Sequence, residues 1–471
     1  MAVRPRGSGS HRTMKVDRRA FLSTGAAAIA CGGAPAIGRE ARRSNIVFIM
    51  ADDLGYADLS CFGRRDYETP HCDALAASGV RFTHSYANSP VCSATRLGLM
   101  TGRYQYRLDA GLEEPIGSRH TGLPPSEPTL PGLLRDMGYR TVLFGKWHLG
   151  NLPDYGPLKS GYDYFWGYRG GGIDYLLHRD AAGQGLWNGT QRVEEAGYLT
   201  TLLGQHAAEF VDAQRFADRP FFLSLHFSAP HWPWETPDDA EEARRIMAEP
   251  SYRAIAHFDG GSMATYAEMV RRMDEQVGRV VAAIDRLPRD RETIIVFTSD
   301  NGGERFSDVW PFTGRKTELL EGGIRVPTII RWPGWYEGGA EDQTPHMTMD
   351  LTASLVAAAG ARFPAVRRPD GRDLRSGGFD QRPMFWRYNH LDQMAVRHGR
   401  HKFLSIAGNE FLFDVVADPM ERANLKEREP GRFAGLRSAW ETWNTTMLPY
   451  RDDSFTHGFH GDELADHFGV E

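Results

Sequence analysis

Short hydrophobic runs alternate with amphipathic stretches from residue 44 to about residue 365 of this chain. Strands buried on both faces are predicted for the continuous runs at 45–50, 141–144, 221–227, 292–303 and 326–334. Helices are predicted for 69–80, with Gly79 as the stop signal, and for 263–287, where apolar residues recur every three or four positions. This alternation predicts an α/β fold with a large, mixed, mostly parallel sheet flanked by helices.

The hydrophobic pattern changes after about residue 365. Short strand-like segments separated by glycine turns follow, and a helix is predicted for 430–447. We therefore divide the chain into a main α/β domain at 41–365 and a smaller C-terminal α+β subdomain with an antiparallel sheet at 366–471.

Residues 1–40 are typical of an export signal and linker rather than of a folded segment. Arg18 and Arg19 precede a weakly apolar, Ala/Gly-rich run that resembles a twin-arginine signal, and 34–36 is a small-residue cleavage site. The run is too short to span a bilayer, so we expect a periplasmic or secreted protein with no transmembrane segment in the mature chain. Two alternatives are lipid attachment at Cys31 and a plain disordered tail.

Composition narrows the class of protein. Of the 471 residues, 41% are hydrophobic and 25% are charged, which is ordinary for a globular enzyme. The formal charge of −6 argues against a nucleic-acid partner, which would require a basic surplus, so any strongly basic pocket must be local. Four cysteines are too few for a disulfide scaffold, and we expect Cys61 and Cys72 to be free thiols, with a pairing between them as the alternative.

Polar residues stand at the carboxyl ends of four of the five predicted core strands. In a parallel sheet the carboxyl ends of the strands lie at one edge, where ligands bind, so these residues are expected to converge. The clusters are Asp52 with Asp53, Lys146 with His148, His231, and Asp300 with Asn301. The carboxylate and amide oxygens suit Ca²⁺, or less well Mg²⁺, rather than Zn²⁺, whereas each acidic pair taken alone could be a simple turn.

Several cationic residues could form a pocket beside this metal site. Lys146 and His148 lie two positions apart on a segment expected to be extended, so both can point the same way. With Arg96, His231 and Lys316 they would bind a tetrahedral dianion, although each alone could be a solvated or core residue. Cys92 precedes a predicted helix at 94–100, where the helix dipole favours negative charge; it could be a packing residue, a thiol nucleophile or the precursor of another group.

The motifs taken together resemble those of sulfatases of the arylsulfatase type, in the alkaline-phosphatase superfamily. The resemblance extends over residues 44 to 447 in the family's order, through NIVFIMADDLGYADLSCFG, SPVCSATRLGLMTGRY, GYRTVLFGKWHLG, SAPHWPW, VFTSDNGG, GRKTELLEGGIRVP and EFLFDVVADPMERANL. It implies an alkaline-phosphatase-like fold and conversion of Cys92 to Cα-formylglycine. Residues 92–96 read Cys-Ser-Ala-Thr-Arg, the alanine form of the modification motif, so the maturation partner could be a formylglycine-generating enzyme or a radical enzyme.

The resemblance also implies a role for each site residue. The metal would be held by Asp52, Asp53, Asp300, Asn301 and the modified residue 92. Arg96 would orient that residue, and Asp300 would activate its attacking hydroxyl. The sulfate oxygens would be bound by Lys146, His231 and Lys316. His231 or Lys316 would protonate the leaving oxygen, and His148 would assist removal of the proton from the second hydroxyl.

Substrate contacts are predicted from two further segments. The Gly- and aromatic-rich stretch at 167–190 offers Asp174, Tyr175 and His178, and the C-terminal region offers Arg387 and His390; ordinary surface loops are the alternative. The sequence thus predicts a sulfuric ester hydrolase that acts on a sulfated carbohydrate or an aryl sulfate. A phosphonate monoester or phosphodiester hydrolase and a noncatalytic sulfated-glycan-binding protein are the alternative functions.

Overall fold

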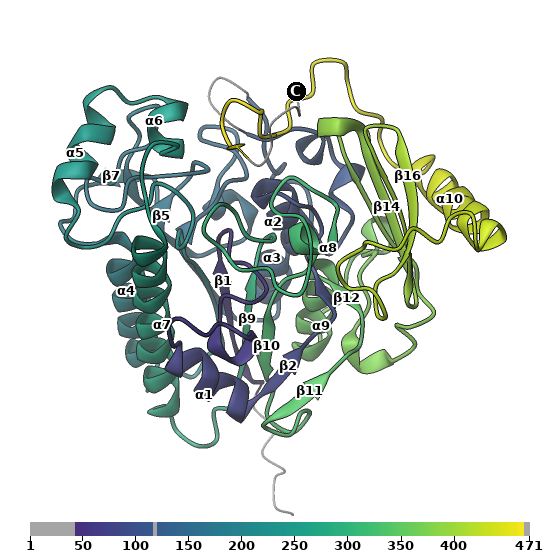
Figure 1. The fold of residues 1–471 in the computed structure, drawn as a ribbon. Helices are drawn as coiled ribbons and strands as arrows, with labels where there is room; N and C mark the ends of the chain where they lie inside the picture. The colour runs from purple at the N-terminus through teal and green to yellow at the C-terminus, as the bar shows by residue number, and fades with distance from the viewer. Residues whose placement is uncertain (1–42, 116–119, 466–471) are drawn as a thin grey trace, which may run out of the picture. The chain divides into compact units, whose positions relative to one another are not determined.

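A ten-stranded mixed sheet forms the centre of the computed structural model, which describes residues 43–115 and 120–465 (Figure 1). The strand order is β11-β2-β10-β9-β1-β8-β4-β5-β6-β7. The parallel centre consists of β9 (Thr293–Ser299), β1 (Asn45–Ala51), β8 (Phe221–His226), β4 (Arg140–Lys146) and β5 (Tyr164–Tyr168). The remaining strands are β2 (Val80–Phe82), β10 (Thr328–Arg331), β11 (Ala340–Asp342), β6 (Leu186–Asn188) and β7 (Gln191–Val193). The predicted export signal at 1–40, including Cys31, lies outside the described residues.

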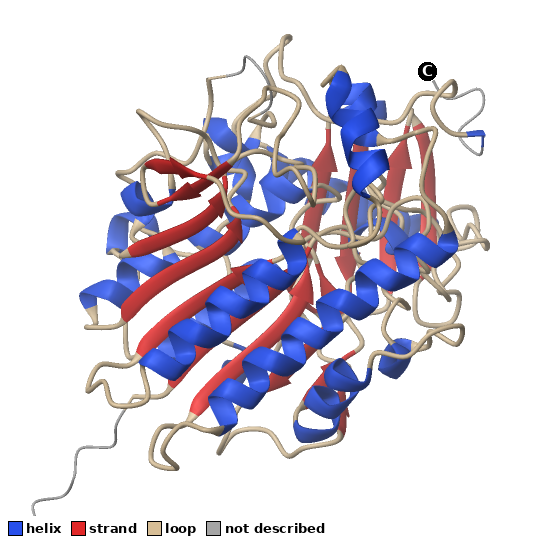
Figure 2. Cartoon of the chain, turned by 90° about the vertical axis from the view of Figure 1, so that its left-hand side faces the viewer, coloured by secondary structure: helices blue, strands red, loops and turns tan. Residues whose placement is uncertain are grey.

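Helices cover both faces of this sheet, as alternate residues of β1 show. Val47 and Ile49 pack into the cluster formed with α1 (Pro70–Ser78), α4 (Leu199–Ala213) and α7 (Met263–Asp285), and Figure 2 views the face on which the long helices lie. Ile46 and Phe48 pack into the opposite cluster, with α2 (Cys92–Thr101), α3 (Leu130–Asp136) and α9 (Thr348–Ala358). Because every residue of β1 is buried, the strand reads as a continuous hydrophobic run.

The C-terminal segment forms a separate four-stranded antiparallel sheet. Its strands are β13 (Met384–Tyr388), β14 (Gln393–His398), β15 (His401–Ile406) and β16 (Asn409–Asp414), and α10 (Pro430–Asn444) packs against β14 and β15. The core below this sheet contains Trp386 and Trp440 together with Tyr86 and Met347 from the earlier part of the chain. The two parts therefore share buried surface, and the boundary at 365/366 stays a prediction.

The remaining elements are short. They are β3 (Ser85–Tyr86) and β12 (His346–Met347), which pair with each other, and the helices α5 (Ala240–Ala248), α6 (Tyr252–Ala256) and α8 (Glu321–Ile324). No helix among the described residues is long and apolar enough to cross a bilayer. Cys61 and Cys72 are free thiols, as expected.

The predicted fold class is confirmed, and the predicted helices agree closely with α1, α7 and α10. The hydrophobic run at 326–334 forms only a four-residue strand, β10, which pairs antiparallel to β9 and places the mixed strands at that edge of the sheet. A hydrophobic run specifies burial but not strand direction, so the direction of β10 could not be predicted from the run.

Candidate active site

The polar clusters that follow β1, β4, β8 and β9 converge at the carboxyl edge of the sheet. Asp52 and Asp53 follow β1 directly, and Asp300 and Asn301 follow β9, its parallel neighbour. Lys146 ends β4, and His231 lies on the loop that follows β8. All of these side chains are almost completely buried, so the sheet gathers charged groups that the solvent does not reach. The convergence predicted from the sequence is confirmed.

The acidic residues form a compact oxygen cluster. The Asp53 backbone NH donates to Asp300 Oδ1 at 3.3 Å, and Asn301 Nδ2 donates to Asp53 Oδ1 at 2.8 Å. Asp53 has a backbone φ of 60°, which turns the chain sharply after the strand. Ligand atoms of Asp52, Cys92 and Asp300 lie within 4.8 Å of one another.

Two oxygens of this cluster fit a cation. Asp52 Oδ1 and Asn301 Oδ1 are buried and have no hydrogen-bond donor among the described residues. Buried oxygens of this kind normally have a partner, and three carboxylates this close together repel one another unless positive charge lies between them. Four hard oxygen-bearing residues are the donor set that Ca²⁺ prefers. The residues present therefore fit the divalent metal that the sequence predicts.

Three cationic side chains surround the same carboxylates. Lys146 Nζ lies 2.5 Å from Asp52 Oδ2, and Lys316 Nζ lies 2.7 Å from Asp53 Oδ2. Arg96 donates from Nε and Nη2 to Asp300 Oδ2, at 3.0 and 2.7 Å. The prediction of a local basic pocket in an acidic chain thus agrees with the structure. These cations are available to an anion if the carboxylates bind a metal ion instead.

Burial and neighbouring charges set the protonation of the site. Burial, and then the neighbouring Asp300, raise the pKa of Asp52 well above its usual range. Burial opposes ionisation of Asp300 as well, but Arg96 and Lys146 outweigh this effect and lower its pKa. Burial disfavours the charged form of Lys316, but Asp53 and the other acidic groups around it together outweigh burial and raise the pKa of the lysine. Asp300 is therefore the residue of the cluster that is best held as a carboxylate.

The two histidines are held in the neutral form. Burial, and then Lys146, lower the pKa of His148 well below the ordinary histidine value. Burial, and then Lys316, do the same for His231. A buried neutral imidazole can accept a proton, which is the property required of a general base.

Cys92 begins α2 and lies beside His148, with Sγ 3.1 Å from Nδ1. The thiol is almost completely buried, and this burial raises its pKa to about 12. A thiol of that pKa is protonated at neutral pH, and only the thiolate is a good nucleophile. The environment therefore disfavours the interpretation of Cys92 as a thiol nucleophile.

His148 reaches the site by a route different from the one predicted. Its backbone φ is 53°, in the left-handed region, so the segment after Lys146 turns and does not continue as an extended strand. The backbone NH of His148 donates to Arg169 O at 3.1 Å, which anchors the turn to the loop after β5. The prediction that both residues enter the site agrees with the structure, but the extended conformation behind it was wrong.

Most of the predicted substrate contacts are buried inside the protein. Asp174 and Tyr175 are fully buried, and the Tyr175 hydroxyl donates to the His231 carbonyl at 2.8 Å. His178 is also buried, with no hydrogen-bond partner for Nε2 among the described residues. Arg387 is buried in the C-terminal part, where Nη1 donates to Asn444 Oδ1 at 2.7 Å. These side chains are therefore buried inside the protein, and among them Tyr175 contacts the backbone of a site residue.

His390 contacts the segment that leads to the C-terminus. A Cβ atom added to Gly458 would lie 2.3 Å from His390 Nδ1, so the imidazole packs directly on that segment. The approach of 387–390 to the mouth of the site stays a prediction; within this segment the Tyr388 hydroxyl lies 3.5 Å from Glu114 Oε1, and Glu114 lies beside Cys92.

Three further residues near the site were not predicted from the sequence. His226 ends β8, where Nδ1 lies 3.3 Å from Arg96 Nη1, and its position at a strand end could have identified it. Glu114 forms a close group with Cys92 and His148, all within 4.8 Å. His457 donates its backbone NH to Glu114 Oε1 at 2.7 Å. The last two belong to loops, and no motif distinguishes them.

Comparisons with known proteins agree with this geometry. The family model described as Sulfatase matches residues 44–361. The chain is 30% identical over 417 residues to the N-acetylgalactosamine-6-sulfatase of Canis lupus familiaris, covering 82% of this chain and 74% of the relative. It is 30% identical over 435 residues to arylsulfatase A of Homo sapiens, covering 83% and 80% of the two chains.

A solved structure shows the same likeness. The crystal structure of Ps i-CgsB in complex with k-i-k-neocarrahexaose superposes with a TM-score of 0.78 at 29% identity, covering 88% of this chain and 95% of that one. The family match spans every strand of the parallel centre and every charged residue gathered at its carboxyl edge. The chain belongs to the sulfatase family, whose members act on sulfate esters.

Proposed function

We propose that this protein releases inorganic sulfate from a sulfate ester by means of a Cα-formylglycine made from Cys92 and a bound Ca²⁺. The observation that supports this most directly is the position of residue 92. Its side chain meets the oxygen cluster of Asp52 and Asp300 on one hand and the imidazole of His148 on the other. A nucleophile at this point lies beside groups that can activate it and groups that can bind an anion.

A hydrated formylglycine supplies two hydroxyl groups on one carbon. One hydroxyl can displace the alcohol from sulfur, and the other can lose its proton and expel sulfate as the aldehyde re-forms, after which water restores the hydrate. Asp52, Asp53, Asp300 and Asn301 would hold Ca²⁺, which lowers the free energy of negative charge on the attacking oxygen and on the sulfate.

The remaining groups act on the nucleophile. Arg96 orients residue 92 and holds Asp300 as a carboxylate, which takes the proton of the attacking hydroxyl. His148, 3.1 Å from the side-chain terminus of residue 92 and neutral, takes the proton of the second hydroxyl.

Other groups act on the ester. Lys146, His231 and Lys316 bind the sulfate oxygens, since all three lie against the same pair of aspartates. The leaving oxygen receives its proton from Lys316, which is held protonated, or from His231 once the neutral imidazole has taken up a proton. Trp232 lies below the Lys316 ammonium, 5.4 Å from the ring centroid to Nζ, and limits where this side chain can point.

The names of the relatives support a sulfated alcohol as substrate. Two kinds of substrate are named among the relatives. The N-acetylgalactosamine-6-sulfatase and the structure in complex with k-i-k-neocarrahexaose point to carbohydrates, and arylsulfatase A points to aryl sulfates. We propose a sulfated carbohydrate or an aryl sulfate as the substrate. Export by the twin-arginine route and maturation by a formylglycine-generating or radical enzyme complete the proposal, and both rest on the sequence motifs.

The proposal is tested by mass spectrometry and kinetics on the same preparation. The peptide that contains residue 92 should carry an aldehyde in place of the thiol, and release of sulfate from an aryl sulfate or sulfated sugars should scale with the modified fraction. Cys92→Ala should be folded and inactive. Full activity with an unmodified thiol would refute the nucleophile, and faster turnover of a matched phosphate diester or phosphonate monoester would refute the sulfatase reaction.

A further inference from the structure

Glu114 places a further carboxylate beside residue 92, in addition to those of Asp52 and Asp300. It lies in the loop after the short turn at Asp109–Gly111, and only 5% of its surface is exposed. Its carboxylate, the Cys92 Sγ atom and a ring nitrogen of His148 all lie within 4.8 Å of one another. Glu114 forms no ion pair among the described residues. None of the proposed catalytic steps uses its carboxylate.

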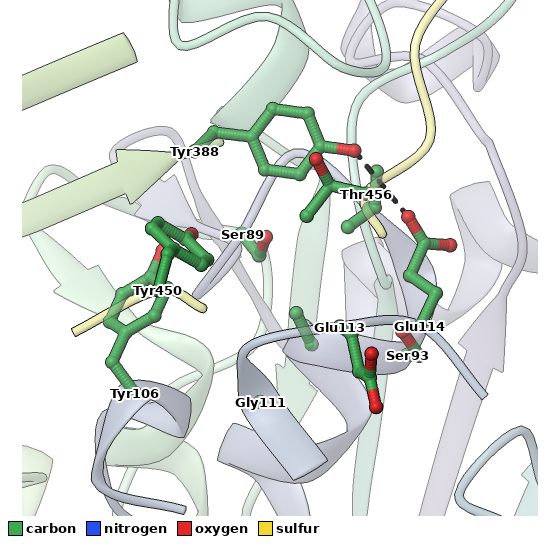
Figure 3. Close-up of a pocket in the computed structure, with 11 residues that line it drawn as sticks. Ser89, Ser93, Tyr106, Gly111, Glu113, Glu114, Tyr388, Tyr450 and Thr456 are labelled. Atoms are coloured by element: carbon green, nitrogen blue, oxygen red, sulfur yellow. Dashed lines mark hydrogen bonds between the residues drawn. The ribbon is translucent and has the colours of Figure 1, made fainter. Parts of the chain in front are cut away.

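The chain holds this carboxylate firmly. The backbone NH of Glu114 donates to Phe455 O at 3.0 Å, and its Oε1 accepts from the His457 backbone NH at 2.7 Å. The Tyr388 hydroxyl lies 3.5 Å from the same oxygen and also donates to the His457 carbonyl. Figure 3 shows the Glu114 carboxylate directed toward Tyr388 and Thr456, whereas neighbouring Glu113 is directed elsewhere. Both polar contacts use Oε1, which leaves Oε2 to accept from another group.

The same C-terminal segment continues the wall of the site. The His457 ring lies 3.4 Å from the Tyr252 hydroxyl. Tyr252, which is 41% exposed, packs edge-to-face on Trp232, and Trp232 in turn contacts the Lys316 ammonium. A row of hydrogen-bonding and aromatic side chains thus runs from Glu114 to the sulfate-binding lysine. Such a surface suits a sugar, which offers hydroxyls at its edge and an apolar face for an aromatic ring.

The position of Glu114 has an electrostatic consequence. A sulfate ester bound beside Cys92 brings a negative charge close to this carboxylate, and two like charges in a buried site repel each other. A hydrocarbon alcohol has no group that could compensate. A hydroxyl or ammonium group next to the sulfated carbon can donate to the free oxygen, and a charge-assisted hydrogen bond of this kind is strong.

We propose that Glu114 binds a hydroxyl or amino group adjacent to the sulfate ester, and that it selects sulfated carbohydrates over sulfate esters of unsubstituted aryl or hydrocarbon alcohols. This inference rests on the proposed sulfatase function. According to this proposal, the C-terminal segment 454–459 helps to determine substrate specificity, although in the sequence it lies outside every motif of the site.

The test compares Glu114→Gln with wild type on two substrate classes. The probes are 4-nitrophenyl sulfate and the monosulfates of methyl galactoside and methyl glucoside, with the formylglycine content of each preparation measured by mass. On the best sugar, kcat/KM should fall about 10- to 100-fold in E114Q. On the aryl sulfate it should not fall and should rise modestly, because no hydrogen bond to Glu114 is lost and the repulsion between the carboxylate and the sulfate is removed. Glu113→Gln is the matched control: Glu113 pairs with Arg451 at 3.1 Å, and both activities should stay near wild type.

A substrate lacking the adjacent hydroxyl sharpens the test. Removing that hydroxyl from the best sugar should lower kcat/KM of wild type by the same factor as the E114Q substitution does on the intact sugar. On the sugar without the hydroxyl, E114Q and wild type should then have nearly equal kcat/KM, because both changes delete the same hydrogen bond. Equal loss on aryl and sugar esters, additive losses in this cycle, or unchanged sugar turnover in E114Q would each overturn the inference alone. A matured wild type that cleaves aryl sulfate but no sugar would also overturn it. A matured wild type that releases no sulfate from any probe would overturn the proposed function, and the inference with it.

Discussion

Arg96 donates from two guanidinium nitrogens to a single oxygen of Asp300, at 3.0 Å from Nε and 2.7 Å from Nη2. The other oxygen of Asp300 accepts from the Asp53 backbone NH, so every part of this carboxylate is fixed. Both side chains are almost completely buried. Arg96, four positions after Cys92 in the chain, therefore has a structural role toward the oxygen cluster.

Replacement of Arg96 by alanine should destabilise the protein strongly. It leaves buried carboxylates without their principal cation, and breaking a buried ion pair lowers the free energy of unfolding by about 3–5 kcal/mol. Urea denaturation with a calcium chelator present measures this change. Arg286→Ala is the control, because its pair with Asp212 is about half exposed on both sides and should contribute less than about 1 kcal/mol. An R96A protein as stable as R286A would contradict the role given to the pair.

The core of the site could be predicted because its residues are encoded locally. Asp52 and Asp300 stand where hydrophobic runs end, and the carboxyl edge of a parallel sheet brings such residues together whatever the detailed packing. Lys146 and His231 followed from the same rule. The fold class could likewise be predicted, because hydrophobic strands and amphipathic helices alternate along the sequence.

The periphery of the site could not be predicted for an equally physical reason. Glu114 and His457 are 343 positions apart and meet only because the C-terminal segment packs against the loop after α2. Tyr175 was expected to contact substrate, since aromatic residues in glycine-rich loops often do. Its hydroxyl instead donates to the His231 carbonyl inside the protein. Whether a tyrosine of such a loop faces substrate or the protein interior depends on packing and cannot be predicted from the residue type.

Calcium should stabilise the folded protein. If Asp52 and Asn301 supply free oxygens to the ion, Ca²⁺ at about 100 times its Kd should add about 2.7 kcal/mol to the free energy of unfolding. For a protein of this size that corresponds to a rise in Tm of several degrees over the chelated sample. Asn301→Ala should reduce this calcium-dependent rise, whereas Asn409→Ala, at the exposed first residue of β16, should keep it. Equal rises in both variants would remove Asn301 from the metal site, and a larger rise with Mg²⁺ would reassign the metal.

A buried pair of carboxyl groups should make stability fall with pH. Glu235 and Asp174 are fully buried, and Glu235 Oε1 and Asp174 Oδ2 have no hydrogen-bond partner besides each other among the described residues. Burial, and then Asp174, raise the pKa of Glu235 far above its ordinary value of 4.5. The folded state therefore keeps a proton that the unfolded state loses, and stability is lost as pH rises above about 4.5.

Glu235→Gln should remove this dependence, because the amide supplies a permanent donor to Asp174. The free energy of unfolding of wild type should fall as pH rises, in a way that the free energy of unfolding of E235Q does not. The difference between the two proteins should therefore grow, in favour of E235Q, by up to about 1.4 kcal/mol per pH unit between pH ~5 and ~8. Denaturation at three pH values measures the slope. Asp174→Asn should flatten it in the same way, and the exposed Glu249→Gln should not. A wild-type slope retained in E235Q would show that the proton is held elsewhere.

Tyr175 should act by positioning His231 rather than by contacting substrate. Its hydroxyl donates to the His231 carbonyl at 2.8 Å, and the ring stacks on Tyr198 at a centroid distance of 5.4 Å. In Tyr175→Phe the carbonyl loses its donor in a buried place, so the free energy of unfolding should fall by about 1–3 kcal/mol. Because His231 is then less well held, kcat should fall about three- to tenfold while KM stays nearly constant.

Tyr198→Phe provides the matched control for this change. Its hydroxyl donates to the Glu235 carbonyl, also at 2.8 Å, but does not contact His231. The two variants should therefore lose similar stability, and only Tyr175→Phe should lose kcat. A rise in KM for sulfated sugars with unchanged kcat would instead make Tyr175 a substrate contact. Such a result would require the segment at 167–190 to open in the complex, because the Tyr175 side chain is fully buried in this structure.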